Sequence, residues 1–175
     1  MPCNQTLNGI VRDCSPSLGG IREVYLANKS DVASVTLSQG KITAISMEAS
    51  GKFHKYAFSR ETGSLTSTYT IDPASGVRFV TSDLVLQFNR METTKRIEIT
   101  ALAQAELVGI VKDANGIYHY LGYEEALEAS AGDGQTGSAR SDANRYTITL
   151  QDISSEMPYE VQVGDGGVDL DTLVA

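Results

Sequence analysis

The sequence has no tryptophan, two histidines and two cysteines among its 175 residues. Cys3 and Cys14 lack Cys or His partners at metal-ligand spacing, and two cysteines do not make a disulfide framework. We expect reduced thiols, with a late disulfide between them as the alternative. His54 and His119 each stand alone, so a zinc site and histidine-based catalysis both lack the partners they need. These scarcities predict a protein that is not an enzyme and holds no cofactor or metal.

No apolar run approaches the roughly 20 residues that a membrane-spanning helix needs. No basic and apolar leader is visible, so we expect synthesis in a cytoplasm and no membrane insertion. Basic residues are also scarce: 14 Lys and Arg stand against 22 Asp and Glu, which gives a net charge of −8. Binding to nucleic acid requires cations that neutralise phosphates, so this balance argues against a protein that holds DNA tightly.

Two segments match functional motifs only in part. Residues 132–138 have the glycines of a phosphate loop but lack its lysine, which favours a flexible loop. Acidic residues gather near it at a spacing too irregular for a calcium loop, and a solvated acidic face is expected. These residues are Glu124, Glu125, Glu128, Asp133 and Asp142. A carboxylate pair for glycoside hydrolysis stays open as an alternative.

Three regions divide the chain. Residues 1–20 are rich in Asn, Ser and Gly and are predicted to form an extended arm. Residues 21–163 are predicted to form a single β-rich domain, and residues 164–175 a tail rich in Gly and Asp. Alternating or β-branched runs predict strands at 21–27, 32–37, 41–47, 52–58, 65–71, 84–91, 107–112, 117–121, 145–151 and 157–163.

Turn and helix signals complete the prediction. Tight hairpin turns are expected at 38–40 and at 113–116, where Asn-Gly separates two apolar runs. Residues 93–105 favour a helix that Thr93 or Thr94 caps, with Ile97, Ala101 and Ala105 as its apolar stripe. A strand is the alternative for this segment. Longer loops are expected at 59–64, 72–82 and 122–144. The fold class is therefore mainly β, a sandwich or barrel of about eight to ten short strands with one flanking helix.

Several segments, taken in order, resemble virion structural proteins of tailed bacteriophages that infect gut Bacteroidetes, and within these the tail tube proteins. They are Cys3-Asn4-Gln5-Thr6-Leu7-Asn8-Gly9-Ile10-Val11-Arg12-Asp13-Cys14 with Gly19-Gly20-Ile21, Phe53-His54-Lys55-Tyr56 with Leu65-Thr66-Ser67-Thr68, residues 84–96, residues 111–118, and residues 132–138 with 142–150 and Pro158-Tyr159. The resemblance spans residues 3–163, and its motifs are structural.

The resemblance implies a subunit that forms rings, usually of six copies, which stack into a tube in the virion tail. Partners would be further copies and other tail proteins, with assembly in the host cytoplasm. Strands of all copies would join in one barrel around a channel, through which DNA passes without specific binding. A ring of six would carry 6 × −8 = −48 formal charges, which would repel DNA phosphates.

Two sets of residues are predicted to serve this assembly. The expected interface residues are Ile10, Val11, Phe79 and Val80, and the expected channel-lining acids are Glu124, Glu125, Glu128 and Asp133. Ordinary core packing is the alternative for Phe79 and Val80. Alternative functions are another virion part (a head decoration, tail terminator or fibre base) and a non-enzymatic binding module.

Overall fold

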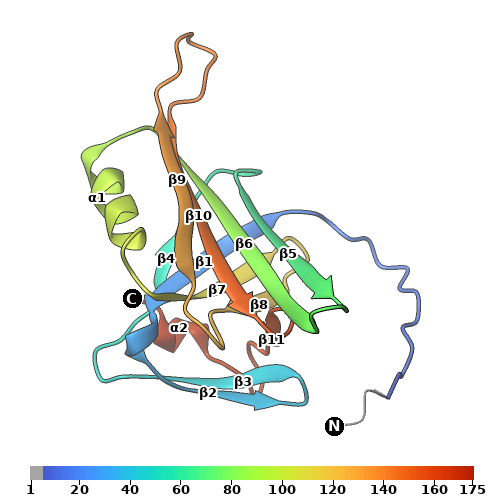
Figure 1. The fold of residues 1–175 in the computed structure, drawn as a ribbon. Coiled ribbons are helices and arrows are strands. Elements are labelled where there is room, and N and C mark those ends of the chain that lie inside the picture. Colours follow the sequence, from blue (N-terminus) through green and yellow to red (C-terminus); the bar gives the residue numbers. More distant parts are fainter. Residues whose placement is uncertain (1–5) are drawn as a thin grey trace.

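The computed structural model describes residues 6–175 and arranges them in two β-sheets (Figure 1). One sheet has seven strands in the order β2-β3-β11-β8-β7-β1-β4, and the other has four in the order β5-β6-β10-β9. The elements are β1 Ile21–Asn28, η1 Lys29–Asp31, β2 Val32–Ser38, β3 Lys41–Met47, β4 His54–Tyr56, β5 Gly63–Asp72, β6 Val77–Asn89, α1 Thr93–Leu102, β7 Leu107–Asp113, β8 Tyr118–Leu121, β9 Glu128–Gln135, β10 Arg145–Ser154, β11 Tyr159–Val161 and α2 Leu170–Leu173.

The predicted mainly-β class is confirmed, with eleven strands and two α-helices in the described part of the chain. Both predicted hairpins form, one joining β2 to β3 and the other joining β7 to β8. Their turns contain residues with positive φ, Gln39 and Gly40 in the first and Gly116 in the second, as tight hairpins require. Local turn chemistry was therefore a sufficient guide to these pairings.

Two loop predictions are wrong. Residues 122–144 were expected to be a loop, yet β9 occupies Glu128–Gln135 and pairs with β10. The flexible-loop interpretation of 132–138 fails for the same reason over its first four residues. Residues 72–82 were also expected to be a loop, but β6 begins at Val77, and Asp72 closes a short turn by accepting the N–H of Ala74 at 3.0 Å.

The main hydrophobic core lies between the two sheets. Strands β6 and β10 contribute alternate inward side chains, and β1 and β7 face them from the larger sheet. A second apolar cluster lies on the opposite face of β1 and β7, with residues of β3, β11 and the segment 168–174. Strands β1 and β7 are therefore buried on both faces, which explains why they are continuous apolar runs rather than alternating ones.

Helix α1 forms as predicted but ends at Leu102 and uses a different face. Leu102 is buried and Ile99 packs beside it in the main core, whereas Ile97 is exposed. The expected stripe through Ile97 is therefore wrong, and the threonine cap is wrong too, because Glu92 is the N-cap and makes no side-chain capping bond. Within residues 6–175, neither helix is long and apolar enough to cross a membrane.

The segment 164–175, which the sequence suggested as a tail, packs on the body. Val168 and Leu170 are buried in the second cluster. The Phe53 N–H donates to the Leu173 carbonyl and the Ala175 N–H to the Phe53 carbonyl, both at 2.9 Å. These bonds tie the C-terminus to the loop before β4, so it serves as a third layer beneath the larger sheet.

Candidate assembly surfaces

The described part of the N-terminal arm, residues 6–20, is exposed along its whole length, and residues 6–17 run clear of both sheets (Figure 1). Leu7, Ile10 and Val11 are 90–101% exposed, and the interface role expected of Ile10 and Val11 stays a prediction. Burying a side chain of this kind gains about 1.5–3 kcal/mol. Burial of these side chains against a partner surface would therefore be favourable. Residues 1–5, including Cys3, lie outside the described residues.

The base of the arm is held firmly against the β7–β8 hairpin. The N–H of Leu18 donates to Asn115 Oδ1 at 2.8 Å, and Asn115 Nδ2 donates to the Leu18 carbonyl at 3.2 Å. The Ala114 N–H donates to the Gly20 carbonyl at 3.0 Å. These three bonds fix the point from which the arm leaves the body.

The four-stranded sheet has one uncovered face. Cross-strand pairing places the small polar residues of β5 beside the outward residues of β6, and the outward residues of β10 continue the same face. These outward residues are Ser64, Thr66, Thr68, Thr70, Phe79, Thr81, Asp83, Val85, Gln87, Thr147, Thr149, Gln151 and Ile153, none of which is buried. The threonines of the strand predicted at residues 65–71 thus form one edge of a larger polar surface.

The outcome for the predicted pair Phe79 and Val80 follows from this alternation. Phe79 is half-buried on the outer face, where it pairs with Thr70. Val80 points inward and is 0% exposed. Val80 is therefore not available to another copy, and the expectation that it forms an interface is wrong. Its partner across the ladder, Tyr69, faces inward too but is 44% exposed.

The four predicted acids are divided between two places. Glu128 and Asp133 lie on the outer face of β9, opposite Gln151 and Thr147. A β-bulge between them makes their five-residue spacing compatible with a single face. Glu124 lies before the strand, where its carboxylate accepts the N–H of Ser155 at 2.8 Å.

Glu125 is exposed and borders a shallow depression with Glu128. The outer face also carries Asp83, which accepts a 2.9 Å hydrogen bond from the Gln151 side chain. The four strands of this sheet contain no lysine and only two arginines, Arg78 and Arg145, at their ends. The surface is therefore polar and acidic through its middle.

Strands β5 and β9 are the free edges of this sheet. They are 10 and 8 residues long and contain neither proline nor lysine. Natural proteins normally protect such edges with charges, bulges or a covering segment, because a free edge offers unpaired N–H and C=O groups to another chain. The bulge in β9 is one such device, but most of both edges remains open to pairing.

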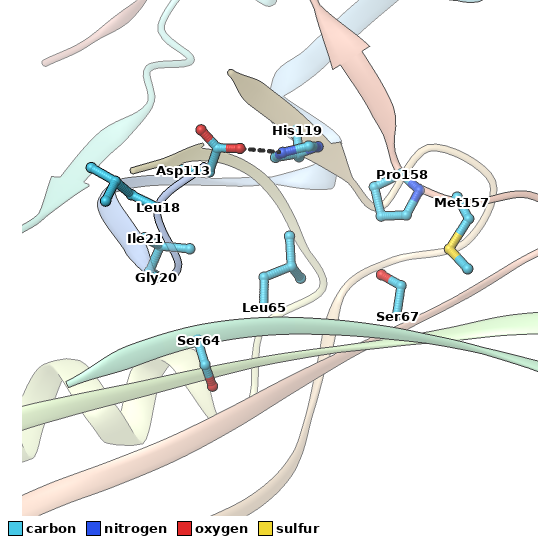
Figure 2. A pocket seen from close by; sticks show the side chains of 10 residues that line it. All are labelled: Leu18, Gly20, Ile21, Ser64, Leu65, Ser67, Asp113, His119, Met157 and Pro158. Atoms are coloured by element: carbon cyan, nitrogen blue, oxygen red, sulfur yellow. Dashed lines mark hydrogen bonds and ion pairs between the residues drawn. The ribbon is translucent and has the colours of Figure 1, made fainter. Parts of the chain in front are cut away.

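A groove of about 430 Å³ opens between the two sheets at the foot of the arm (Figure 2). We call it the end groove. Its lining residues are Leu18, Gly20, Ile21, Ser64, Leu65, Ser67, Asp113, His119, Met157 and Pro158. Figure 2 shows β5 with Leu65 and Ser67 forming one wall, while Met157, Pro158 and His119 face them from the other side.

The end groove contains serine, histidine and aspartate without the contacts of a catalytic triad. His119 Nε2 lies 3.4 Å from Asp113 Oδ2, but the hydroxyl of Ser67 bonds to Ser82 at 2.7 Å. A nucleophile has to lie within hydrogen-bonding reach of its base, and no Ser67–His119 bond is present. No group of three or more metal-ligating side chains occurs in residues 6–175.

A second groove, of about 340 Å³, lies between α1 and β4. Tyr56 donates a hydrogen bond across it to Glu98. Burial, followed by this bond to the carboxylate, raises the pKa of Tyr56 above its ordinary value of 10.0. The bond fastens the helix to the sheet, so this groove is a packing seam of α1.

Three features of these surfaces were missed by sequence reasoning: strand β9, the end groove and the buried acid Asp152. The alternation of residues 145–154 did carry a signal for Asp152, because it shares the inward side with Ile148 and Leu150. Comparisons of the chain with known protein families, with curated proteins and with solved structures found no match.

Proposed function

We propose that the chain is a structural subunit of a bacteriophage tail tube, assembling as stacked rings of six copies around a channel for DNA. The observation that carries the proposal is the four-stranded sheet, which has two free edges and one uncovered polar face. The sequence resemblance supports the choice of family. The sheet supports a particular way for the copies to join.

The direction of the strands favours ring closure. Each neighbouring pair in the order β5-β6-β10-β9 is antiparallel, so β5 and β9 run in opposite directions. When copies stand side by side in one orientation, β5 of one copy therefore meets β9 of the next as an antiparallel pair. Six copies would give a barrel of 6 × 4 = 24 strands with no free edge in this sheet.

The uncovered face suits the inside of such a ring. The larger sheet packs on the other side of the four-stranded sheet, where α1 contributes Leu102 to the main core and α2 contributes Leu170 to the second cluster. The bulkier side of a subunit fits the larger outer circumference. The inner surface would then present threonine, glutamine and acidic side chains. Such a surface offers no cations through its middle to bind the phosphates of DNA, so DNA slides along it without being retained.

Electron microscopy of the purified chain in negative stain tests the proposal directly. We expect rings with a central hole and stacks of rings, and light scattering at the same concentrations should report the corresponding masses. In virions, a tube subunit should be present in many tens of copies. A strictly monomeric species at high protein concentration would overturn the proposal.

Cysteine cross-linking tests the joining of edges. In chains with Cys3→Ser and Cys14→Ser, we would place Thr68→Cys on β5 of one preparation and a cysteine at Glu128, Ala131 or Asp133 on β9 of another. At least one of these outward positions should cross-link to Thr68→Cys after mixing. Ala129→Cys is the control, because Ala129 packs against the main core and should not react.

A further inference from the structure

We infer that the arm of one copy docks in the end groove of a second copy, with Ile10 and Val11 packed between Leu65 and Met157. This inference rests on the self-assembly in the proposed function, and it deepens that function by naming both contact surfaces. The end groove shares β5 with the edge pairing, but the docking uses inward side chains of that strand, whereas the edge pairing uses its backbone N–H and C=O groups.

The arm is directed away from its own groove. Leu18 lines the end groove and is held there by its two hydrogen bonds to Asn115. Beyond Leu18 the chain passes Pro16 and a turn in which Asp13 accepts the N–H and the hydroxyl of Ser15, both at 2.8 Å. The earlier part of the arm then runs away from the two sheets (Figure 1), and none of residues 6–12 lines the groove. A neighbouring copy can offer a groove without any reversal of this path.

The end groove lacks an apolar cover. The inward face of β5 continues beyond it as Tyr69 and Ile71, which are 44% and 57% exposed although the neighbouring Val80 is fully buried. Met157 on the facing wall is 39% exposed. Exposed apolar side chains at the groove and on β5 beyond Ser67 favour a contact site, and the exposed apolar side chains of the arm are of the matching chemistry.

One charge of the arm suits the groove, that of Arg12, although Asp13 follows it and leaves the described arm with no net charge. Arg12 is the one basic residue in the described part of the arm, and it directly follows the apolar pair Ile10-Val11. Asp113 borders the apolar part of the groove. We place Arg12 of the docked arm beside Asp113 of the neighbour, which sets the direction in which the arm enters the groove.

Arm and groove are different surfaces of the same chain. A contact between them is therefore head-to-tail, and contacts of this kind generate closed rings or open stacks rather than two-fold dimers. Each copy would give one arm and accept one, so every added copy leaves one arm and one groove for the next. This is the behaviour that stacking of identical rings requires.

Cross-linking between two single-cysteine preparations tests the docking. Both carry Cys3→Ser and Cys14→Ser; one adds Ile10→Cys and the other Met157→Cys. The matched control replaces Met157→Cys by Ile97→Cys, because Ile97 on α1 is 57% exposed and lies outside the groove. Docking raises the local concentration of the two thiols to roughly millimolar, so we expect the heterodimer to form at least about tenfold faster than in the control.

Equal rates with Met157→Cys and Ile97→Cys would overturn the inference. So would a chain carrying both Ile10→Cys and Met157→Cys that closes only within itself, since the arm would then fold back on its own copy. Electron microscopy of the same samples separates the two proposals. Tubes without the preferred cross-link would refute the docking alone, whereas an unassembled, uncross-linked chain would refute both.

Discussion

Asp152 lies on the inward side of β10 and is 2% exposed. Its Oδ2 accepts the N–H of Gly122 at 3.1 Å, and its Oδ1 has no protein partner among the described residues. Burial raises the pKa of this carboxyl, and the Gly122 N–H opposes the rise only in part. The alternation of side chains along β10 places the Asp152 carboxyl between the two sheets, where an apolar or neutral group is favoured.

The raised pKa predicts a pH-dependent stability. The pKa in the folded state lies above the ordinary value of 3.8. The contribution of Asp152 to folding is therefore fully present below pH 3.8 and is lost as the pH rises through the folded-state value. Asp152→Asn keeps an acceptor for Gly122 and removes the charge. Urea unfolding should find the variant more stable than the natural chain by about 1 kcal/mol at pH 7, and less so at pH 4. A difference independent of pH would contradict this.

Both the backbone conformation at position 122 and the atoms around it require a glycine there. Its φ is +85°, and an added Cβ would lie 2.9 Å from the carbonyl oxygen of Leu107. Gly116 has a similar φ of +88° but open space around it. We predict that Gly116→Ala costs about 1 kcal/mol of unfolding free energy and Gly122→Ala more than about 2 kcal/mol. Urea denaturation of the two variants measures the difference. Equal losses of unfolding free energy would show that the atoms around Gly122 shift to accommodate the added methyl group.

At the scale of elements, sequence pattern and structure agree where the pattern is local. Residues 65–71 alternate and lie within β5, and the Asn115-Gly116 turn joins two strands as expected. Strand β9 had no such signal, because glycine, alanine and serine have low β-propensity. It forms because β10 offers a complete edge, and seven residues of β10 pair with it.

The arm is the element whose removal is most informative. We predict that deletion of residues 1–15 leaves the melting temperature unchanged within about 2 °C, because the described residues of this segment bury nothing and a surface change is worth at most about 0.5 kcal/mol. Assembly, measured by sedimentation and electron microscopy, should fall sharply. Loss of the folded state on deletion would instead show that the arm belongs to the core.

For the whole molecule, sheet order decides which surfaces are available. The seven-stranded sheet is covered on both faces over β1 and β7, whereas the four-stranded sheet is covered on one. The polar, lysine-free side of the latter is consequently an uncovered face built on regular strands. Its acids Glu128 and Asp133 come together only because β9 exists and contains a bulge.

If the chain has the proposed function, reversal of charge on this face should make the face bind DNA. Glu128→Lys with Asp133→Lys changes the net charge of each copy from −8 to −4. We predict that assembled particles of the variant retain DNA in a gel-shift assay at low salt and release it as salt rises. In phage, passage of DNA should slow and infectivity should fall.

The matched control is Glu48→Lys with Asp165→Lys. Both residues are exposed and lie outside the four-stranded sheet, so the total charge is the same but its location differs. Retention of DNA by both variants would mean that net charge, and not the outer face of the sheet, controls the interaction. Retention by neither would remove the electrostatic argument for the channel.

The sequence by itself determined the β-rich class and the two tight hairpins, and it favoured helix α1 over a strand. These depend on the period of side chains and on turn residues within one contiguous segment, which act before any distant contact forms. The tertiary structure alone decided that Val80 is buried, that β9 is a strand, and that β5 and β9 are edges. Each of these depends on pairing between segments far apart in the chain, and no local pattern encodes which segments will meet.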